Sequence, residues 1–164
     1  DPRIIATTGW TTDELSAAID AAEPLGTFDL VSLLIGVNNQ YRGRSVDAYR
    51  DEFDALLARA TGFANGRADR VRVLSIPDWG VTPFAIQSGR DRIRIADELD
   101  ACNAAARDAC AARGIAFVDI AAISRTLGEQ AAMLAGDGLH PSALMYAEWT
   151  RLALPYARAM VAAV

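Results

Sequence analysis

The sequence predicts a doubly wound, parallel α/β fold, with helices on both faces of one sheet in three layers. Short apolar runs alternate with longer segments of helical periodicity along the whole chain. Segments of that length suit the helical crossovers that parallel strands need between them. No repeat, linker or low-complexity segment divides the 164 residues, so residues 1–164 are expected to form a single domain.

The amino-terminal part predicts two strands separated by one helix. The first strand is expected at residues 3–6 (RIIA). A capping box, with Thr11 as the N-cap and Glu14 reaching back, opens the first helix, and Pro24 ends it. Residues 29–35 (DLVSLLI) form a near-continuous apolar run, which is typical of a strand buried on both faces.

The middle of the chain repeats this alternation. Residues 36–43 are expected to form a loop, after which Ser45 caps a helix with one apolar face. Residues 71–76 (VRVLSI) predict the next strand, and a long loop follows it. A third helix carries an apolar stripe and ends at Gly114.

The carboxyl-terminal part adds one strand and two helices. The strand is expected at residues 115–120 (IAFVDI), and a short helix follows near residues 127–134. A final helix begins at about Ser142. Pro155 is expected to kink or split it, because proline lacks a backbone N–H and clashes with the preceding turn.

Composition excludes several classes of protein. Hydrophobic residues make up 52% of the chain, which excludes a disordered segment. The net charge of −5 is spread without a basic stripe, so nucleic acid is not an expected partner. No apolar run approaches the ~20 residues of a membrane span. The chain begins without a methionine, so the lack of a leader says little about location, and a cytoplasmic location is favoured over a secreted one.

Two cysteines and one histidine offer no metal site. Cys102 and Cys110 lie in one predicted helix, ~12 Å apart along its axis, which is too far for a disulfide. Both are expected to be buried, reduced thiols. Together with His140 they are too few and wrongly spaced for a metal centre, and no cofactor is expected.

Polar and glycine residues collect in the loops that follow the strands. In an open parallel sheet, ligands bind beyond the carboxyl ends of the strands, so these loops should meet at one edge. The expected site is therefore formed by residues 7–10, 36–41, 77–80 and 137–140.

His140 is the only histidine, and Asp137 precedes it by three residues, a spacing that one helical turn converts into contact. A carboxylate there can accept a proton from one ring nitrogen and leave the other facing a nucleophile. In the alternative interpretation, His140 is structural and Asp137 only caps the following helix.

Asn38 and Gly9 suit the stabilisation of an oxyanion. Asn38 follows an apolar strand and can donate its side-chain amide, and Gly9 can bring a backbone N–H close because no side chain blocks the approach. Alternatively, both are ordinary turn residues. Four aromatic residues either line a substrate pocket or cover the edges of the core: Trp10, Tyr41, Trp79 and Phe84.

These loops are similar to the sequence blocks of the SGNH (GDSL) hydrolase family, and the similarity spans essentially the whole chain. Residues 137–140 (DGLH), followed by Pro141, match the family's Asp-x-x-His block. Residues 36–39 (GVNN) match its Gly-x-Asn-Asp block, and Gly9 matches the glycine of block II. The resemblance implies a serine esterase or lipase that cleaves small-molecule acyl esters through an acyl-enzyme.

The resemblance also implies a role for each matching residue. His140 is the expected general base, Asp137 its orienting partner, and Gly9 and Asn38 the oxyanion-hole donors. Asn39 replaces the family's usual aspartate, so no carboxylate role is expected at that position. The candidate substrate-binding residues are Asn39, Tyr41, Trp79 and Trp10.

The family's Gly-Asp-Ser block, which carries the nucleophile on the first strand, has no match in this sequence. The hydroxyl residues present are poor substitutes, because they lie in strands, cap a helix or lack a base of their own: Ser32, Ser75, Ser142, Thr7 and Thr8. The nucleophilic serine is therefore expected upstream of Asp1, so that the domain is truncated at its amino end.

The resemblance implies a flavodoxin-like strand order, in which the absent first strand would be central, between the strands at residues 3–6 and 29–35. Its loss leaves a gap of two strand spacings, ~9.5 Å, lined by unpaired backbone groups. We therefore expect the strand to come from an N-terminal fragment or from a neighbouring subunit of a homo-oligomer, unless the sheet pairs again without it.

Two further functions are alternatives to ester hydrolysis by this chain. The chain is a catalytically silent fragment or assembly component if it keeps the architecture of the site without a nucleophile. A nucleotide-binding domain is disfavoured, because no strand is followed by a Gly-x-Gly-x-x-Gly or Walker-type loop.

Overall fold

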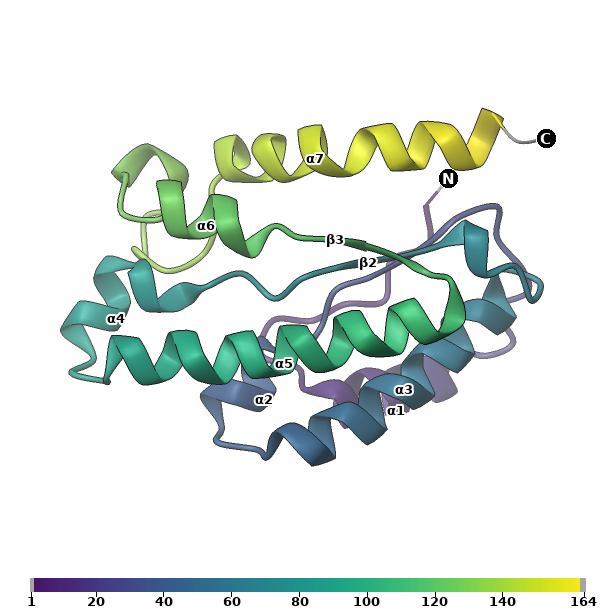
Figure 1. The fold of residues 1–164 in the computed structure, drawn as a ribbon, viewed down its shortest axis with the longest axis horizontal. Helices are drawn as coiled ribbons and strands as arrows, with labels where there is room; N and C mark the ends of the chain where they lie inside the picture. The colour runs from purple at the N-terminus through teal and green to yellow at the C-terminus, as the bar shows by residue number, and fades with distance from the viewer. Residues whose placement is uncertain (1, 163–164) are drawn as a thin grey trace.

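The computed structural model describes residues 2–162 and has three layers, α/β/α (Figure 1). A parallel sheet of three strands forms the middle layer, in the order β1 (Val31–Leu33), β2 (Val71–Leu74) and β3 (Ala116–Val118). Helices α1 (Thr12–Ala22), α3 (Val46–Phe63) and α5 (Arg92–Arg113) cover one face. Helices α6 (Ala121–Leu127) and α7 (Ala143–Ala162) lie on the other, so the expected fold class is confirmed.

The predicted strand at residues 3–6 is wrong. These residues have no strand assignment, and β1 pairs with β2 alone among the described strands. Ile4 is 76% exposed. A β-strand exists only through its ladder, and this apolar segment has no neighbour with which to form one.

The three observed strands are shorter than the apolar runs that predicted them. In register, Val31 lies opposite Val71, and Val73 lies opposite Phe117. The contact between the last two strands continues one residue further, where Ser75 N–H donates to the Val118 carbonyl at 2.9 Å. Beyond that point the two segments diverge into loops. The length of each strand is therefore set by its hydrogen-bonded partners and not by the length of its apolar run.

The predicted helix boundaries follow local capping chemistry. Thr11 N–H donates to the Glu14 carboxylate at 2.8 Å, which completes the capping box of α1. Ser45 Oγ accepts from Ala48 N–H at 3.2 Å at the start of α3. Gly114, with φ of +67°, ends α5 in the left-handed region that glycine tolerates.

Several short helices lie where loops were expected. Residues 36–43 contain α2 (Val37–Tyr41), and the loop after β2 contains two turns, η2 (Trp79–Val81) and α4 (Pro83–Gln87). The Thr82 hydroxyl accepts from Ala85 N–H at 3.3 Å and Pro83 begins α4, a local signal that the sequence does carry. The turn η1 (Ala68–Arg70) directly precedes β2.

The short helix expected near residues 127–134 is displaced. Residues 121–127 form α6, and only the turn η3 (Ala131–Met133) lies in the predicted range. Helix α7 runs through Pro155 as one element, so the proline does not split it.

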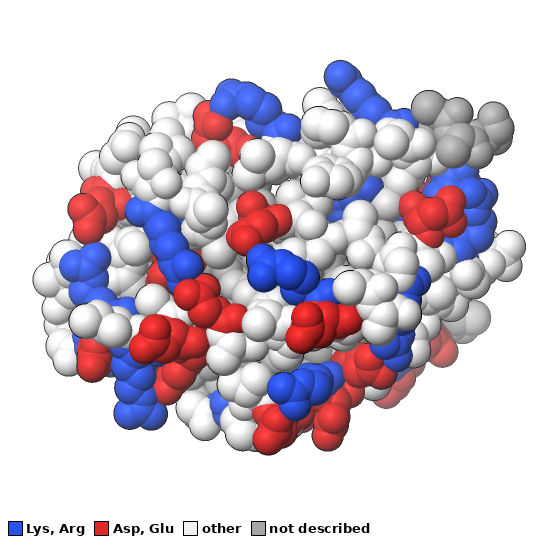
Figure 2. Space-filling view, in the orientation of Figure 1, with Lys and Arg blue, Asp and Glu red and all other residues white. Residues whose placement is uncertain are grey.

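The larger core cluster lies between the sheet and the α1–α3–α5 layer, and a smaller cluster lies beneath α7. Cys102 and Cys110 are buried, unpaired thiols of the larger cluster, and burial raises the pKa of each to about 11. Arginine and acidic side chains are interspersed over one face of the molecule (Figure 2). No helix within the described residues is long and apolar enough to cross a bilayer.

Candidate active site

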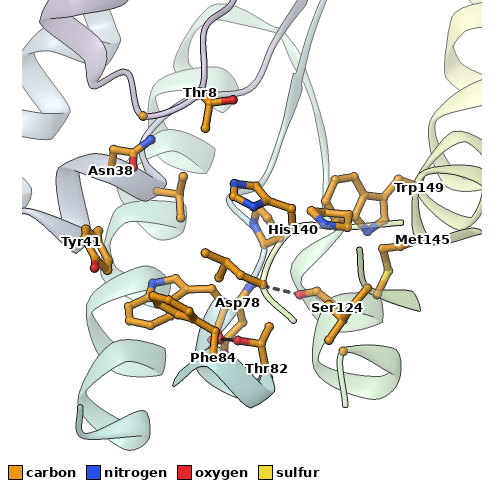
Figure 3. Close-up of a pocket in the computed structure, with 18 residues that line it drawn as sticks. Thr8, Asn38, Tyr41, Asp78, Thr82, Phe84, Ser124, His140, Met145 and Trp149 are labelled. Carbon is orange, nitrogen blue, oxygen red and sulfur yellow. Dashed lines mark hydrogen bonds between the residues drawn. The ribbon is translucent and has the colours of Figure 1, made fainter. Parts of the chain in front are cut away.

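The loops beyond the carboxyl ends of the strands enclose a cavity of about 340 Å³ (Figure 3). Each of the four predicted loops contributes to it, and α7 closes one side. Its lining is largely apolar and contains no arginine. The residues of interest in the lining are Thr8, Gly9, Asn38, Tyr41, Asp78, Trp79, Phe84, His140, Met145 and Trp149.

His140 and Asp137 are in direct contact at this cavity. His140 Nδ1 lies 2.6 Å from Asp137 Oδ2. The other carboxylate oxygen, Oδ1, accepts the backbone N–H groups of Leu139 at 3.0 Å and of His140 at 2.9 Å. The spacing of three residues predicted the contact, but an Asx-type turn produces it instead of a helical turn.

The turn that carries this pair is held at both ends. The Ala135 N–H donates to the His140 carbonyl at 2.7 Å, and Leu134 forms an antiparallel bridge with Pro141. Gly138, with φ of +67°, accepts Phe84 N–H on its carbonyl at 3.2 Å, which ties the turn to α4. The dyad is therefore fixed by backbone contacts although its side chains are about half exposed.

Asp137 is ionised over the neutral range. The Leu139 N–H, the imidazole and the His140 N–H lower the pKa of the carboxyl to about 2. An ionised carboxylate only accepts hydrogen bonds, so in this contact the proton resides on His140 Nδ1. The second ring nitrogen, Nε2, is then the one able to accept a proton from a hydroxyl.

Gly9 and Asn38 line the cavity with their donors available. Gly9 has φ of +93°, and within the described residues its N–H has no hydrogen-bond partner. Asn38 Nδ2 donates one hydrogen to the Trp10 carbonyl at 3.0 Å, and its second hydrogen makes no described hydrogen bond. Arg42 Nη2 donates to the Gly9 carbonyl at 2.6 Å, which anchors that loop to the end of α2.

Gly36 makes the position of Asn38 possible. It precedes α2 with φ of +128°, and a Cβ there would lie 2.6 Å from atoms of both Ile76 and Tyr49. Only glycine fits this backbone and this space. The glycine at that position of the sequence is therefore required for the turn that presents Asn38.

Tyr41, Trp79 and Phe84 form one aromatic wall of the cavity. The Tyr41 and Trp79 ring centroids are 5.4 Å apart, and those of Trp79 and Phe84 are 6.2 Å apart. Trp79 Nε1 donates to Gln40 Oε1 at 2.8 Å, which fixes the indole from behind. The Arg90 guanidinium lies 4.0 Å above the Tyr41 ring.

Two of the substrate-binding candidates lie outside the cavity. Asn39 is 1% exposed and bonds with Thr12 through both ends of its amide. Successive residues of a helix point about 100° apart, so when Asn38 faces the cavity Asn39 faces the core. The Trp10 ring packs against the core cluster and contributes only its carbonyl, through Asn38.

Sequence reasoning placed Asp78 in a loop of the expected site but missed its partners in α6, and it missed the residues from α7. Asp78 is 4% exposed and pairs with Arg125 at 2.8 Å, while its backbone N–H donates to Ser124 Oγ at 2.9 Å. Met145 and Trp149 face the cavity from α7. The only signal for the latter two was the apolar stripe of the last helix, which a core function already explains.

Within residues 2–162, the His140 ring bonds to Asp137 alone, and no hydroxyl contacts it. Ser75 is buried and bonds to Asp119 and to backbone N–H groups, and Ser142 Oγ donates to the Ala132 carbonyl. Thr8 lines the cavity. The described part of the chain contains no group of three residues able to hold a metal ion.

The sequence model of the GDSL-like Lipase/Acylhydrolase family matches residues 2–148. A search of curated proteins found no match. Among solved structures, a lipase/acylhydrolase from Enterococcus faecalis is similar, with a TM-score of 0.64 and 18% identity over 92% of this chain and 72% of that chain. An acetyl xylan esterase from Geobacillus stearothermophilus has a TM-score of 0.69 and 19% identity, over 91% of this chain and 68% of that chain. An α/β hydrolase from the metagenome of Lake Arreo, Spain, has a TM-score of 0.65 and 20% identity, over 93% of this chain and 70% of that chain. At these identities the likeness to solved structures shows the fold.

Proposed function

The chain belongs to the GDSL-like lipase/acylhydrolase family, and from this premise we propose that it hydrolyses carboxylic esters through an acyl-enzyme. One observation carries the proposal. His140, which is joined to Asp137 at 2.6 Å, lines the same cavity as Gly9 and Asn38, whose donors have hydrogens without a described partner. A base with its orienting carboxylate and a pair of donors are the parts that acyl transfer needs beside a nucleophile.

In the proposed reaction, a serine Oγ attacks the ester carbonyl carbon while His140 Nε2 takes the hydroxyl proton. The carbonyl oxygen becomes negative and accepts hydrogen bonds from Gly9 N–H and Asn38 Nδ2–H. His140 then gives its proton to the leaving alcohol as the carbon–oxygen bond breaks. Water, deprotonated by the same imidazole, releases the acid and restores the serine.

The nucleophilic serine is proposed to lie on a strand that is not among residues 1–164. No hydroxyl of the described residues bonds to His140. The serine must approach from the space between Gly9 and Asn38, because both donors and His140 Nε2 have to reach one carbonyl group. Thr8 lines the cavity, but among the described residues its hydroxyl forms no hydrogen bond with a base that would activate it, and the His140 ring bonds to Asp137.

The cavity suits an uncharged, apolar acyl group. Its volume of about 340 Å³ would hold about ten non-hydrogen groups, taking ~30 Å³ for each as for liquid water. Trp79 and Phe84 offer a flat apolar wall, and no arginine lines the cavity to bind an anionic substrate. We therefore expect esters of short or medium alkyl or aryl acids to be preferred over charged acids.

The test offers p-nitrophenyl butyrate to the 164-residue chain and to the same chain extended at its amino end by a Gly-Asp-Ser strand and a connecting helix. We expect the extended chain to turn over, and His140→Ala to reduce its kcat at least ~10³-fold. Asp137→Asn should also reduce kcat strongly, whereas Asp108→Asn, on the exposed side of α5, should leave kcat within twofold. An extended chain that turns over equally well with His140→Ala would overturn the proposal.

A silent component of a larger hydrolase is the second candidate, and the absence of a described hydroxyl partner for His140 favours it for this chain alone. The same assay separates the two candidates. Turnover by the 164-residue chain that disappears with His140→Ala rejects the silent component. Turnover by the extended chain alone is what the proposed reaction expects of a 164-residue chain that is silent by itself, whereas turnover by neither chain supports the silent component against the proposed reaction.

A further inference from the structure

A series of hydrogen bonds runs from the aromatic wall of the cavity to the surface of α5. Trp79 Nε1 donates to Gln40 Oε1 at 2.8 Å. Gln40 Nε2 donates in turn to Glu98 Oε2 at 2.8 Å, and Arg94 Nε donates to Glu98 Oε1 at 2.7 Å. We call Trp79, Gln40 and Glu98 the indole brace. It joins three elements, because Trp79 lies in η2, Gln40 in α2 and Glu98 in α5.

The orientation of the Gln40 amide is fixed by the two ends of the indole brace. An indole N–H can only donate a hydrogen bond, and an ionised carboxylate can only accept one. The amide therefore satisfies both neighbours in one orientation alone, with its oxygen toward Trp79 and its nitrogen toward Glu98. The Gln40 amide, and after it Arg94, holds the pKa of the Glu98 carboxyl below its usual value, which keeps the accepting end charged.

Burial makes the inner members of the indole brace dependent on Glu98. Trp79 and Gln40 are each 6% exposed, whereas the Glu98 side chain is 36% exposed. A buried polar group that loses its partner costs free energy unless it finds another. Loss of the Glu98 acceptor therefore frees the Gln40 amide to turn, and the indole then loses the hydrogen bond that depends on the present orientation of that amide.

The Trp79 indole has no second polar anchor. Its Nε1 is the one hydrogen-bonding atom of a tryptophan side chain, and the ring is attached through a torsion with broad preferences. The backbone of Trp79 lies in η2, a single turn of three residues. The tilt of the ring at the cavity is therefore set by its packing and by the indole brace.

Trp79 is the middle ring of the aromatic wall, with its centroid 5.4 Å from that of Tyr41 and 6.2 Å from that of Phe84. The charged groups that support the wall, Glu98 and Arg90, do not line the cavity. The wall therefore presents aromatic carbon to a substrate. Aromatic rings attract one another in offset-stacked and edge-to-face contacts, so this wall favours an aromatic group over a saturated group of the same size.

We propose that the aromatic wall selects esters of aryl carboxylic acids, and that Glu98, acting through Gln40, is the positioning residue that holds Trp79 in place for this selection. The inference rests on the proposed function, because it names the acid part of the ester bound at the same site. Glu98 does not line the cavity, so it acts on which ester binds and not on the transfer of a proton.

The first test follows, by NMR, the exchange of the indole hydrogens of the 164-residue chain with water. We expect Glu98→Ala to accelerate exchange of the Trp79 indole hydrogen at least ~10-fold, because its hydrogen bond opens more often. Glu98→Gln keeps an acceptor oxygen for Gln40, so exchange should stay within ~3-fold of the unaltered chain. The Trp149 indole is also buried but has no described hydrogen-bond partner. It is the internal reference for the fold, and its exchange should not change.

The second test measures the dissociation constants of butyrophenone and cyclohexyl propyl ketone, which have the same number of non-hydrogen atoms. They are the analogues of ethyl benzoate and ethyl cyclohexanecarboxylate in which a methylene replaces the ester oxygen, so their binding needs no nucleophile. We expect the 164-residue chain to bind the aryl ketone about fivefold more tightly, as one aromatic contact allows. Glu98→Ala should reduce this preference to less than about twofold, and Glu98→Gln should retain it. Asp97→Ala, at the exposed neighbouring position of α5, is the matched control and should also retain it.

A double variant tests whether Glu98 acts through Gln40. In the background of Gln40→Leu, we expect Glu98→Ala to cause no further acceleration of Trp79 exchange. An unchanged Trp79 signal in Glu98→Ala, or equal acceleration of the Trp79 and Trp149 signals, would overturn the role of Glu98. Equal affinity of the unaltered chain for the two ketones, or binding of neither, would overturn the aryl selection. Hydrolysis of p-nitrophenyl butyrate by the extended chain would still support the proposed function in that case, so the two failures are distinguishable.

Discussion

The two oxygens of Asp137 have different partners. Oδ1 accepts hydrogen bonds from two backbone N–H groups of its own turn, and Oδ2 accepts a hydrogen bond from the imidazole of His140. The carboxylate is therefore oriented by the backbone before it orients the ring. The sequence predicted this contact through a spacing of three residues. The same sequence could not separate Asn38 from Asn39, because which of two adjacent amides faces the cavity depends on the phase of the short helix α2.

The order of these contacts predicts how Asp137 titrates. Its pKa is lowered to about 2, with the Leu139 N–H as the largest cause and the imidazole as the second. In a carbon-13 NMR titration, we expect the Asp137 carboxyl to remain mostly ionised at pH 3. In the His140→Ala variant, we expect the pKa of Asp137 to stay below the ordinary value for aspartate. Because the folded pKa is depressed, the contribution of Asp137 to stability is complete above about pH 4 and is lost as pH falls toward 2. A pKa near 3.9 in the variant would show that the ring, not the turn, sets the value.

At the scale of elements, the helix caps and the helical crossovers could be predicted from the sequence, whereas the pairing of the strands could not. The capping box of α1, the Ser45 cap and the Gly114 end of α5 depend on neighbours within a few residues, so sequence alone predicts them. Residues 3–6 have the composition of a strand, but a strand also needs a neighbour, which is a property of tertiary structure. Their lack of a strand assignment therefore shows that local preference and available partners disagree at this segment.

The start of α2 gives a second prediction. We expect Gly36→Ala to destabilise the protein by at least about 2 kcal/mol, because its Cβ would clash with Ile76 and Tyr49 on a backbone of positive φ. Gly43→Ala is the matched control: φ is +70° and no atom lies within 4 Å, so it should cost about 1 kcal/mol from strain alone. Urea unfolding measures both. Equal losses would mean that close packing at Gly36 contributes nothing.

At the scale of the whole molecule, the candidate active-site cavity depends on contacts between loops that follow different strands. Asp78, in the loop after β2, pairs with Arg125 of α6 at 2.8 Å, and the same guanidinium reaches Asp100 of α5 at 2.8 Å. Arg125 of α6 thus links the loop that carries Trp79 to α5. No sequence spacing predicted this network, because its members are about 25 and 47 residues apart and coupled only by the fold.

This network gives a third prediction. Arg125→Met leaves the Asp78 carboxylate, 3% exposed, without its cation, and should cost about 2–3 kcal/mol, less than a fully buried pair because Arg125 itself is partly hydrated. Arg151→Met, which breaks the exposed pair with Glu148, should change stability by no more than about 0.5 kcal/mol. Thermal and urea unfolding provide the comparison. Gly80 N–H donates to Asp78 Oδ1 at 2.8 Å, and a similar small loss for both variants would show that this hydrogen bond is enough to satisfy the Asp78 carboxylate.

Because the His140–Asp137 pair is half exposed, the attraction between its two side chains should change during the proposed reaction. With water on both side chains the effective dielectric constant around the pair is high, and the attraction between a carboxylate and an imidazolium is weak. An apolar acyl group entering the cavity displaces that water and lowers the dielectric constant. In the proposed reaction the substrate thus completes the electrostatic environment in which the imidazolium forms, and we expect longer acyl chains to strengthen the pair more than acetate does.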